Sequence, residues 1–183
     1  INQDVVAGGR GFGLHPHRNM EIISYPLRGV LAHRDTSGGG GELRHGDVQV
    51  MSAGSGIAHE EMNGSRDEEV EFVQIWLLPN REGVAPGYEE KHFDAGQRRG
   101  RLRLLVSPDG RDDSISAHQD ALLYGTLLDA GETVTHTPET GRRIYVHVVA
   151  GRVDVNGHGL GAGDGVRARD EADALRIAND TDF

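Results

Sequence analysis

Short apolar runs separated by glycine constrain the fold of this chain more than any other feature. Val, Ile and Leu dominate the runs, and 27 glycines in 183 residues divide them. The run at residues 70–78 alternates apolar and polar side chains, as a half-buried strand does. No window of useful length shows the 3.6-residue period of an amphipathic helix. The pattern predicts an all-β protein made of sandwiches or barrels.

The predicted strands share this apolar composition and are bounded by turn-forming or charged residues. They are residues 21–27, 30–34, 47–51, 70–78, 101–106, 122–128, 143–150, 152–155 and 174–178. Residues 79–100 instead combine Pro, Gly and clustered charges. We interpret this stretch as a linker between two lobes, with one short helix.

A faint internal repeat supports the division into two lobes. Gly29 and Gly151 each begin a strand that continues into a hairpin. A Gly-Asp pair follows each hairpin, at residues 46–47 and 163–164. We interpret Asp47 and Asp164 as turn formers. The repeat predicts two tandem lobes, residues 1–95 and residues 96–183.

Composition limits the kinds of partner and site. The chain has no cysteine, so any metal must be bound by histidine and carboxylate. Its net charge of −10 argues against nucleic acid or an anionic membrane as the primary partner. No stretch approaches the roughly 20 apolar residues of a membrane span. We expect a cytoplasmic monomer that binds neither nucleic acid nor membranes, and the start at Ile1 leaves an N-terminal signal unjudged.

Two histidine clusters form the candidate functional site. His15 and His17 are two positions apart, and a second cluster contains His59 and Glu61. Side chains at i and i+2 of a strand point to the same face. Each pair can therefore present its two side chains together, while Glu60 points to the other face. Two such strands facing each other inside a barrel would offer three imidazole nitrogens and one carboxylate, which suits a divalent transition metal.

Each pair alone also has an ordinary explanation. A His-x-His pair is often found on a surface strand without a ligand, and Glu60-Glu61 by itself fits a solvated acidic turn. The metal interpretation depends on the presence of both pairs, each behind a glycine-rich turn. In the second copy of the repeat, Thr137 and Glu139 stand opposite His15 and His17. We therefore expect the second lobe to bind no metal.

Both histidine clusters lie within longer motifs. The spacing Gly-x5-His-x-His-x3/4-Glu-x6-Gly is followed, with one extra residue before the last glycine, by Gly9, His15, His17, Glu21 and Gly29. A second motif runs from Gly46 to His59, with Ser in place of the usual Pro and two extra residues. Further characteristic segments are residues 15–18, 33–35, 46–49 and 74–79. Taken together, these motifs resemble the cupin superfamily and, within it, the pirin family, over nearly the whole chain.

The resemblance implies a bicupin, which is a pair of tandem jelly-roll-like cupin barrels with a metal site in the first. It implies that one divalent transition metal is bound by His15, His17, His59 and Glu61. Glu21, a ligand in many other cupins, is not expected to bind. Fe(II) is our first choice of metal, and the donor set also suits Cu, Ni, Mn or Zn.

The resemblance also implies an activity, that of quercetin 2,3-dioxygenase. A flavonol-like phenolic substrate would bind through its 3-hydroxyl, whose pKa the metal lowers, and Glu61 would accept the proton as catalytic base. The flavonolate would react with O2, the heterocycle would open and carbon monoxide would leave. A second hypothesis is a metal- or redox-responsive regulatory protein without turnover, which acts through a protein partner.

Four further residues lie outside the proposed ligand set. His33 and His45 flank the first hairpin, and we interpret them as turn or surface residues, with a place in the lining of the pocket as the alternative. Gln74 and Trp76 share one strand face. They belong either to the core or to the wall of a pocket. A pocket wide enough for a three-ring substrate would favour the enzyme, and a plugged metal would favour the regulatory protein.

Overall fold

The structure is a computed structural model that describes residues 1–169 and 174–179. Within these residues almost all regular structure is β, as predicted, with one short helix, α1 (Ala95–Arg98), and one 3-10 turn, η1 (Arg111–Asp113). The chain forms two compact units. The first comprises Ile1–Asp94 and Leu104–Tyr124, and the second comprises Ala95–Arg103 and Gly125–Phe183. No helix in the described ranges is long and apolar enough to cross a membrane.

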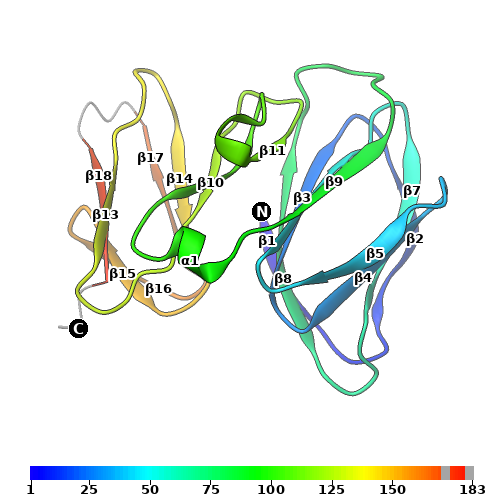
Figure 1. The fold of residues 1–183 in the computed structure, drawn as a ribbon, viewed down its shortest axis with the longest axis horizontal. Coiled ribbons are helices and arrows are strands. Elements are labelled where there is room, and N and C mark those ends of the chain that lie inside the picture. Colours follow the sequence, from blue (N-terminus) through cyan, green and yellow to red (C-terminus); the bar gives the residue numbers. More distant parts are fainter. Residues whose placement is uncertain (170–173, 180–183) are drawn as a thin grey trace. The chain divides into compact units, whose positions relative to one another are not determined.

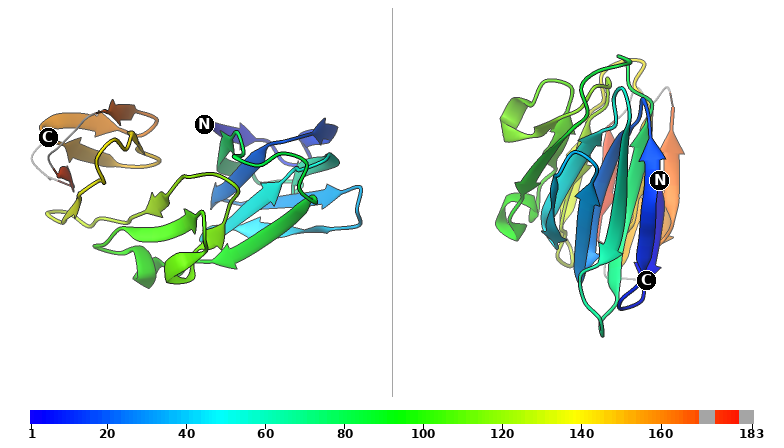
Figure 2. Two further views of the ribbon diagram at one scale, coloured as in Figure 1. Left: turned by 90° about the horizontal axis from the view of Figure 1, so that it is seen from above. Right: turned by 90° about the vertical axis from the view of Figure 1, so that its right-hand side faces the viewer.

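Two antiparallel sheets lie face to face in the first unit (Figures 1 and 2). One has the order β1-β8-β3-β6-β9 and consists of β1 (Asn2–Val6), β3 (Glu21–Arg28), β6 (Asp47–Ser52), β8 (Val70–Leu77) and β9 (Gly87–His92). The other has the order β2-β7-β4-β5 and consists of β2 (Gly11–His17), β4 (Val30–Asp35), β5 (Gly40–Arg44) and β7 (Ile57–Asn63). The two sheets form a sandwich whose facing side chains share one interior.

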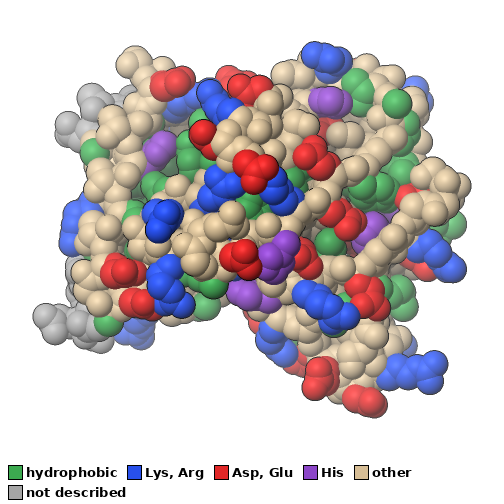
Figure 3. Space-filling view, viewed as in Figure 1, with side chains coloured by type: hydrophobic (Ala, Val, Ile, Leu, Met, Phe, Trp, Pro, Cys, Tyr) green, Lys and Arg blue, Asp and Glu red, His purple; other side chains and the backbone are tan. Residues whose placement is uncertain are grey.

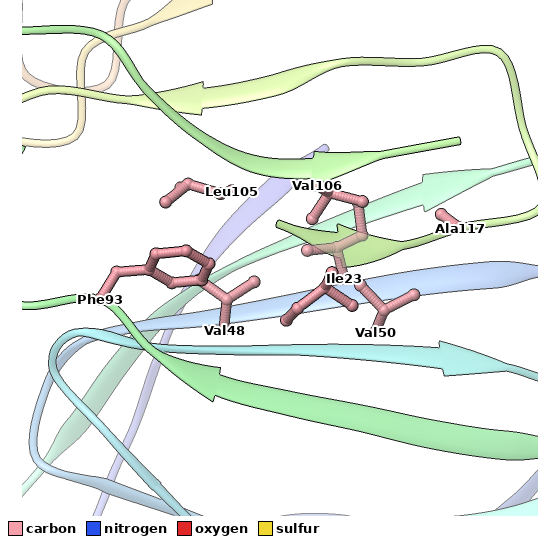
Figure 4. Packing of buried hydrophobic residues seen from close by; sticks show 8 residues of the cluster. Ile23, Val48, Val50, Phe93, Leu105, Val106 and Ala117 are labelled. Atoms are coloured by element: carbon pink, nitrogen blue, oxygen red, sulfur yellow. The ribbon is translucent and has the colours of Figure 1, made fainter. Parts of the chain in front are cut away.

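The central strands of the five-stranded sheet of the first unit are buried on both faces. One face packs against residues 104–117, which include most of β10 (Arg103–Ser107) and all of β11 (Ile115–Ser116). Figure 4 shows this apolar cluster, in which Ile23 and Val48 of the sheet lie opposite Val106. Because both faces are covered, the first four residues of β3 are all buried. Ile22 and Ile23 therefore pack on opposite faces of the sheet, one into each apolar cluster.

The facing sides of the two sheets contribute apolar clusters and a set of buried polar side chains. The apolar clusters are Ile22, Met51, Ala53 and Ile57, and Leu31, Leu43, Val70 and Phe72. The buried polar side chains on these strands include Ser24, His33, Gln49, His59, Glu61 and Gln74. Buried polar groups require partners. Their concentration in one sandwich therefore marks it as the place to look for a functional site.

The second unit has its own sheets and its own core. A four-stranded sheet of order β13-β18-β15-β16 consists of β13 (Thr133–His136), β18 (Leu175–Ala178), β15 (Arg152–Val155) and β16 (His158–Gly161). A second pair consists of β14 (Ile144–His147) and β17 (Gly165–Ala168). The buried centre of this unit is formed by Val134, Val155, Leu175 and Ile177. The remaining strand, β12 (Leu123–Gly125), pairs with β10.

The internal repeat corresponds to two matching hairpins. The hairpin β4–β5 in the first unit and the hairpin β15–β16 in the second are both antiparallel. After each hairpin an aspartate accepts a hydrogen bond from the backbone N–H three residues earlier. The distance is 2.7 Å from Arg44 N to Asp47 Oδ2 and 2.8 Å from Gly161 N to Asp164 Oδ2. The prediction that both aspartates form turns is confirmed.

The organisation of the chain differs from the sequence prediction at two places. Within the expected linker 79–100, the helix α1 is present, but β9 pairs with β6 and belongs to the first sheet. Residues 104–124, which we expected to belong with residues 96–183, cluster with the first unit. Residues 170–173 and 180–183 of the expected second lobe lie outside the described residues.

Side chains of both signs are intermixed on the face of the molecule that Figure 3 shows. In the first unit Arg28 pairs with Glu69 and with Glu71, each at 2.9 Å, and Arg34 pairs with Glu60 at 2.7 Å. The last pair has a bearing on the site. It draws the Glu60 side chain to the opposite side of β7 from the buried side chains of His59 and Glu61, as strand parity predicts.

Gly54 lies in the turn before β7 and has a positive φ of 47°. A Cβ there would clash with the carbonyl oxygen of Val84, and a left-handed backbone costs an L-residue about 1–2 kcal/mol. We expect Gly54→Ala to lower the free energy of unfolding by at least ~2 kcal/mol in urea denaturation. At Gly87 an added Cβ meets no atom within 4 Å, so Gly87→Ala should change the free energy of unfolding by less than ~0.5 kcal/mol. Equal effects of the two changes would contradict this account.

Candidate metal centre

Pairing between β2 and β7 brings the two histidine clusters together. His15 lies directly opposite His59, and His17 lies opposite Ile57. The ring centroids are 4.8 Å apart for His15 and His17, 4.6 Å for His15 and His59, and 5.1 Å for His17 and His59. One ligand nitrogen from each ring lies within 4.8 Å of the others. The two predicted pairs therefore meet as neighbours in one sheet, in a three-histidine group.

Two of the rings show features that suit metal binding. The Nδ1–H of His15 donates to the carbonyl oxygen of Gly13 at 2.7 Å, which leaves Nε2 with a free lone pair. His59 is 1% exposed, and both of its ring nitrogens are buried without a hydrogen-bond partner among the described residues. Such orphaned buried nitrogens are rare. A metal ion bound to one of them would satisfy it, so the residues present fit a metal.

The protonation states also suit metal binding. Burial, with a smaller contribution from the neighbouring His15 and His17, lowers the pKa of His59 to about 4. Burial, followed by the neighbouring His15, lowers the pKa of His17. Neutral imidazole is the form that binds metals, because the proton and the metal compete for one lone pair. His59 therefore stays in its ligand form at neutral and mildly acidic pH.

Glu61 lies two residues after His59 on the same buried face of β7. Its carboxylate accepts hydrogen bonds from Gln74 Nε2, at 3.0 Å to Oε1 and 2.9 Å to Oε2, and from Ser24 Oγ at 3.3 Å. Burial raises the pKa of Glu61, and the bonds from Gln74 and Ser24 oppose this rise. Glu61 is not a member of the group whose ligand atoms lie within 4.8 Å of one another. Its role as a metal ligand stays a prediction.

Gln74 and Trp76, which the sequence placed either in the core or at a pocket, border this site. Gln74 is buried and contacts Glu61, whereas Trp76 is 48% exposed. The indole Nε1–H of Trp76 donates to Gln74 Oε1 at 2.8 Å. The indole ring meets the ring of His17 edge-on, with centroids 5.0 Å apart and an interplanar angle of 87°. Trp76 therefore contacts the site on its histidine side and, through Gln74, on its carboxylate side.

The interpretation of His33 as a turn or surface residue is wrong. Its side chain is 3% exposed, and Nε2 lies 2.8 Å from Glu90 Oε1 and 2.8 Å from Gln49 Nε2. His33 shares the buried face of β4 with Leu31 and lies opposite Glu61 of β7. Strand parity with Leu31 was the signal that could have placed it inside. His45, by contrast, lies exposed in the turn after β5, as predicted.

Glu21 is buried but has other partners. Its Oε2 accepts hydrogen bonds from Ser52 Oγ at 2.8 Å and from the backbone N–H of His118 at 3.1 Å. Among the described residues Glu21 is not part of the three-histidine group. Its burial is thus explained at least in part by contacts to β6 and to the segment that covers the sheet.

The fold and the site together define the class of this protein. It has cupin-type β-barrels, and the candidate metal centre lies in the first of them. The family described as Pirin matches residues 1–77, and the family described as Quercetinase C-terminal cupin domain matches residues 104–183. The chain belongs to the pirin family. The predicted family and the predicted fold of two tandem cupin-type barrels are therefore confirmed.

Named relatives and solved structures agree with this membership. The chain is 42% identical over 182 residues to quercetin 2,3-dioxygenase of Escherichia coli K12, and the aligned region covers all of this chain and 77% of that protein. It is 43% identical over 172 residues to a pirin-like protein of Caulobacter vibrioides, 93% of this chain and 74% of that one. The crystal structure of bacterial pirin YhhW from Escherichia coli in complex with nickel(II) has a TM-score of 0.90 and 40% identity, over 97% of this chain and 76% of that one.

Proposed function

We propose that this protein is a metal-dependent dioxygenase that cleaves flavonol-like phenolics with O2, as quercetin 2,3-dioxygenase does. The observation that carries the proposal is a group of three histidine nitrogens that lie within 4.8 Å of one another. One of these histidines, His59, is two residues before the buried carboxylate of Glu61 on the same strand. The identity of 42% to an enzyme named quercetin 2,3-dioxygenase supports the reaction type. In the same proposal the protein is a cytoplasmic monomer.

His15, His17, His59 and Glu61 would hold one divalent transition metal. The orphaned nitrogens of His59 and the free Nε2 of His15 support the histidine ligands. Fe(II) is our first choice, and Cu, Ni, Mn or Zn also suit these donors; the nickel(II) complex of YhhW supports a transition metal. When bound, such a metal supplies Lewis acidity, which lowers the pKa of a hydroxyl placed on it.

Glu61 is the proposed catalytic base of the chain. A carboxylate oxygen of Glu61 accepts the proton of the flavonol 3-hydroxyl. Burial favours this transfer, because it raises the pKa of Glu61 and makes the carboxylate a better proton acceptor. Gln74 and Ser24 hold the carboxylate by hydrogen bonds throughout. The half-exposed ring of Trp76, beside His17, is available to an aromatic substrate.

Elemental analysis combined with oxygen uptake tests this function. Purified protein is expected to carry about one transition metal per chain and to consume O2 with quercetin, releasing carbon monoxide in equal amount. Metal-free protein should consume none. If the metal-loaded protein turned over no flavonol, the dioxygenase assignment would be withdrawn. The regulatory hypothesis, in which the metal-loaded protein binds a protein partner, would take its place.

A further inference from the structure

We propose that Trp76 and Gln74 form a positioning pair that orients the Glu61 carboxylate toward the three histidines. The pair deepens the proposed function, since it rests on Glu61 completing that metal site. We propose neither Trp76 nor Gln74 as a metal ligand. Trp76 acts on Gln74, and Gln74 acts on Glu61.

The first step of the argument is the direction of the Gln74 amide. A glutamine side chain has one carbonyl acceptor and one NH2 donor group, and an indole N–H can only donate. The 2.8 Å hydrogen bond from Trp76 Nε1 therefore fixes Oε1 of Gln74 toward the indole. The NH2 group must then face Glu61, where it lies 3.0 and 2.9 Å from the two oxygens. The reversed amide would set donor against donor at Trp76 and acceptor against acceptor at Glu61.

The second step is the burial of the carboxylate and its donors. Glu61 is 3% exposed, Gln74 7% and Ser24 1%. Water has little access to replace a lost donor, so a Glu61 oxygen without Gln74 would stay unsatisfied, at a cost larger than for a neutral group. Ser24 lies directly opposite Gln74 in the pairing of β3 with β8. These two side-chain donors to Glu61 thus come from one cross-strand pair, and the sheet itself sets their spacing.

The third step is that the two contacts of Trp76 can be separated. Its ring packs edge-on against His17, and its N–H bonds to Gln74. Trp76→Phe keeps an aromatic ring beside His17 and removes the N–H donor together with the smaller part of the indole. Because Trp76 is 48% exposed, this change leaves little buried space and should not prevent folding.

A double-mutant cycle on Ni(II) affinity tests the pair without any flavonol. Loss of an outer partner of a metal ligand typically costs 10–100-fold in metal affinity, and we expect Gln74→Leu to weaken Ni(II) binding in this range. Trp76→Phe should weaken it by about three- to tenfold, because the amide is then free to turn. In the double variant Trp76→Phe should add less than about twofold. Leu78→Ala, an exposed apolar neighbour of Trp76 in sequence, should leave the affinity unchanged.

The visible absorption of the Co(II)-loaded protein adds a readout that a purely structural role would not move. Gln74→Leu and Trp76→Phe should shift the Co(II) bands in the direction that Glu61→Gln shifts them, and Leu78→Ala should not. Additive effects of Gln74→Leu and Trp76→Phe, or tighter Ni(II) binding by either, would overturn the positioning pair. Failure of the dioxygenase function would appear differently, as intact metal affinity and coupling without flavonol turnover.

Discussion

His59→Ala is expected to abolish metal binding and, with it, flavonol turnover. His59 is the most buried of the three histidines, and its ring nitrogens have no other partner among the described residues. Loss of a direct ligand should exceed the 10–100-fold cost of losing an outer partner, so we expect affinity to fall by at least ~100-fold. Equilibrium dialysis with Ni(II), followed by elemental analysis, measures this. His15→Ala, at a less buried position, should give the same result with less effect on packing.

The matched control is His118→Ala. His118 contacts Glu21 through its backbone N–H, which alanine retains. This variant should bind metal like the wild type. Full metal stoichiometry in His15→Ala and His59→Ala together would show that the three-histidine group is not the site.

Glu61→Gln is expected to reduce turnover per bound metal by roughly a hundredfold or more, the usual scale for a positioned base. The amide keeps the shape and one oxygen donor but loses the charge and the basicity. With three histidines in place the metal should still bind, though more weakly. Rate and metal content are measured on the same sample, so that reduced occupancy is not mistaken for reduced catalysis.

Glu60→Gln is the control for this change. Glu60 pairs with Arg34 on the other face of β7, so its neutralisation should leave the rate per metal unaffected. An unchanged rate per metal in Glu61→Gln would remove Glu61 from proton transfer. Its remaining function would then be to balance charge at the metal.

The three histidines of the candidate site could be predicted from the sequence because the prediction depends on the spacing of neighbouring residues. The spacing of His15 and His17 depends only on the two-residue period of a strand. We expected His15 and His59 to meet across two strands that face each other. In the structure their strands instead pair directly within one sheet. His33 escaped prediction because its hairpin position suggested a turn, although it has the parity of buried Leu31.

Other parts of the fold could not be predicted because they depend on contacts between distant residues. β9 lies in a stretch whose Pro, Gly and charges resemble a linker, and it becomes a strand by pairing with β6. β2 and β7 contain too many Gly, His and Glu residues to form an apolar run. The bonds of Gln74 to Glu61 and to Trp76 require both the register of the sheet and the side-chain directions.

The cover of the five-stranded sheet has a consequence for biosynthesis. Ile23, Val48 and Val50 are buried partly by Leu105, Val106 and Ile115, which follow the last strand of that sheet by more than ten residues. While the ribosome has released only the segment through β9, one apolar side of the sheet faces water. Chains at this point of translation would be prone to associate with one another and would be suitable clients for a chaperone. The first barrel can therefore reach its final packing only after residue 117 has left the exit tunnel.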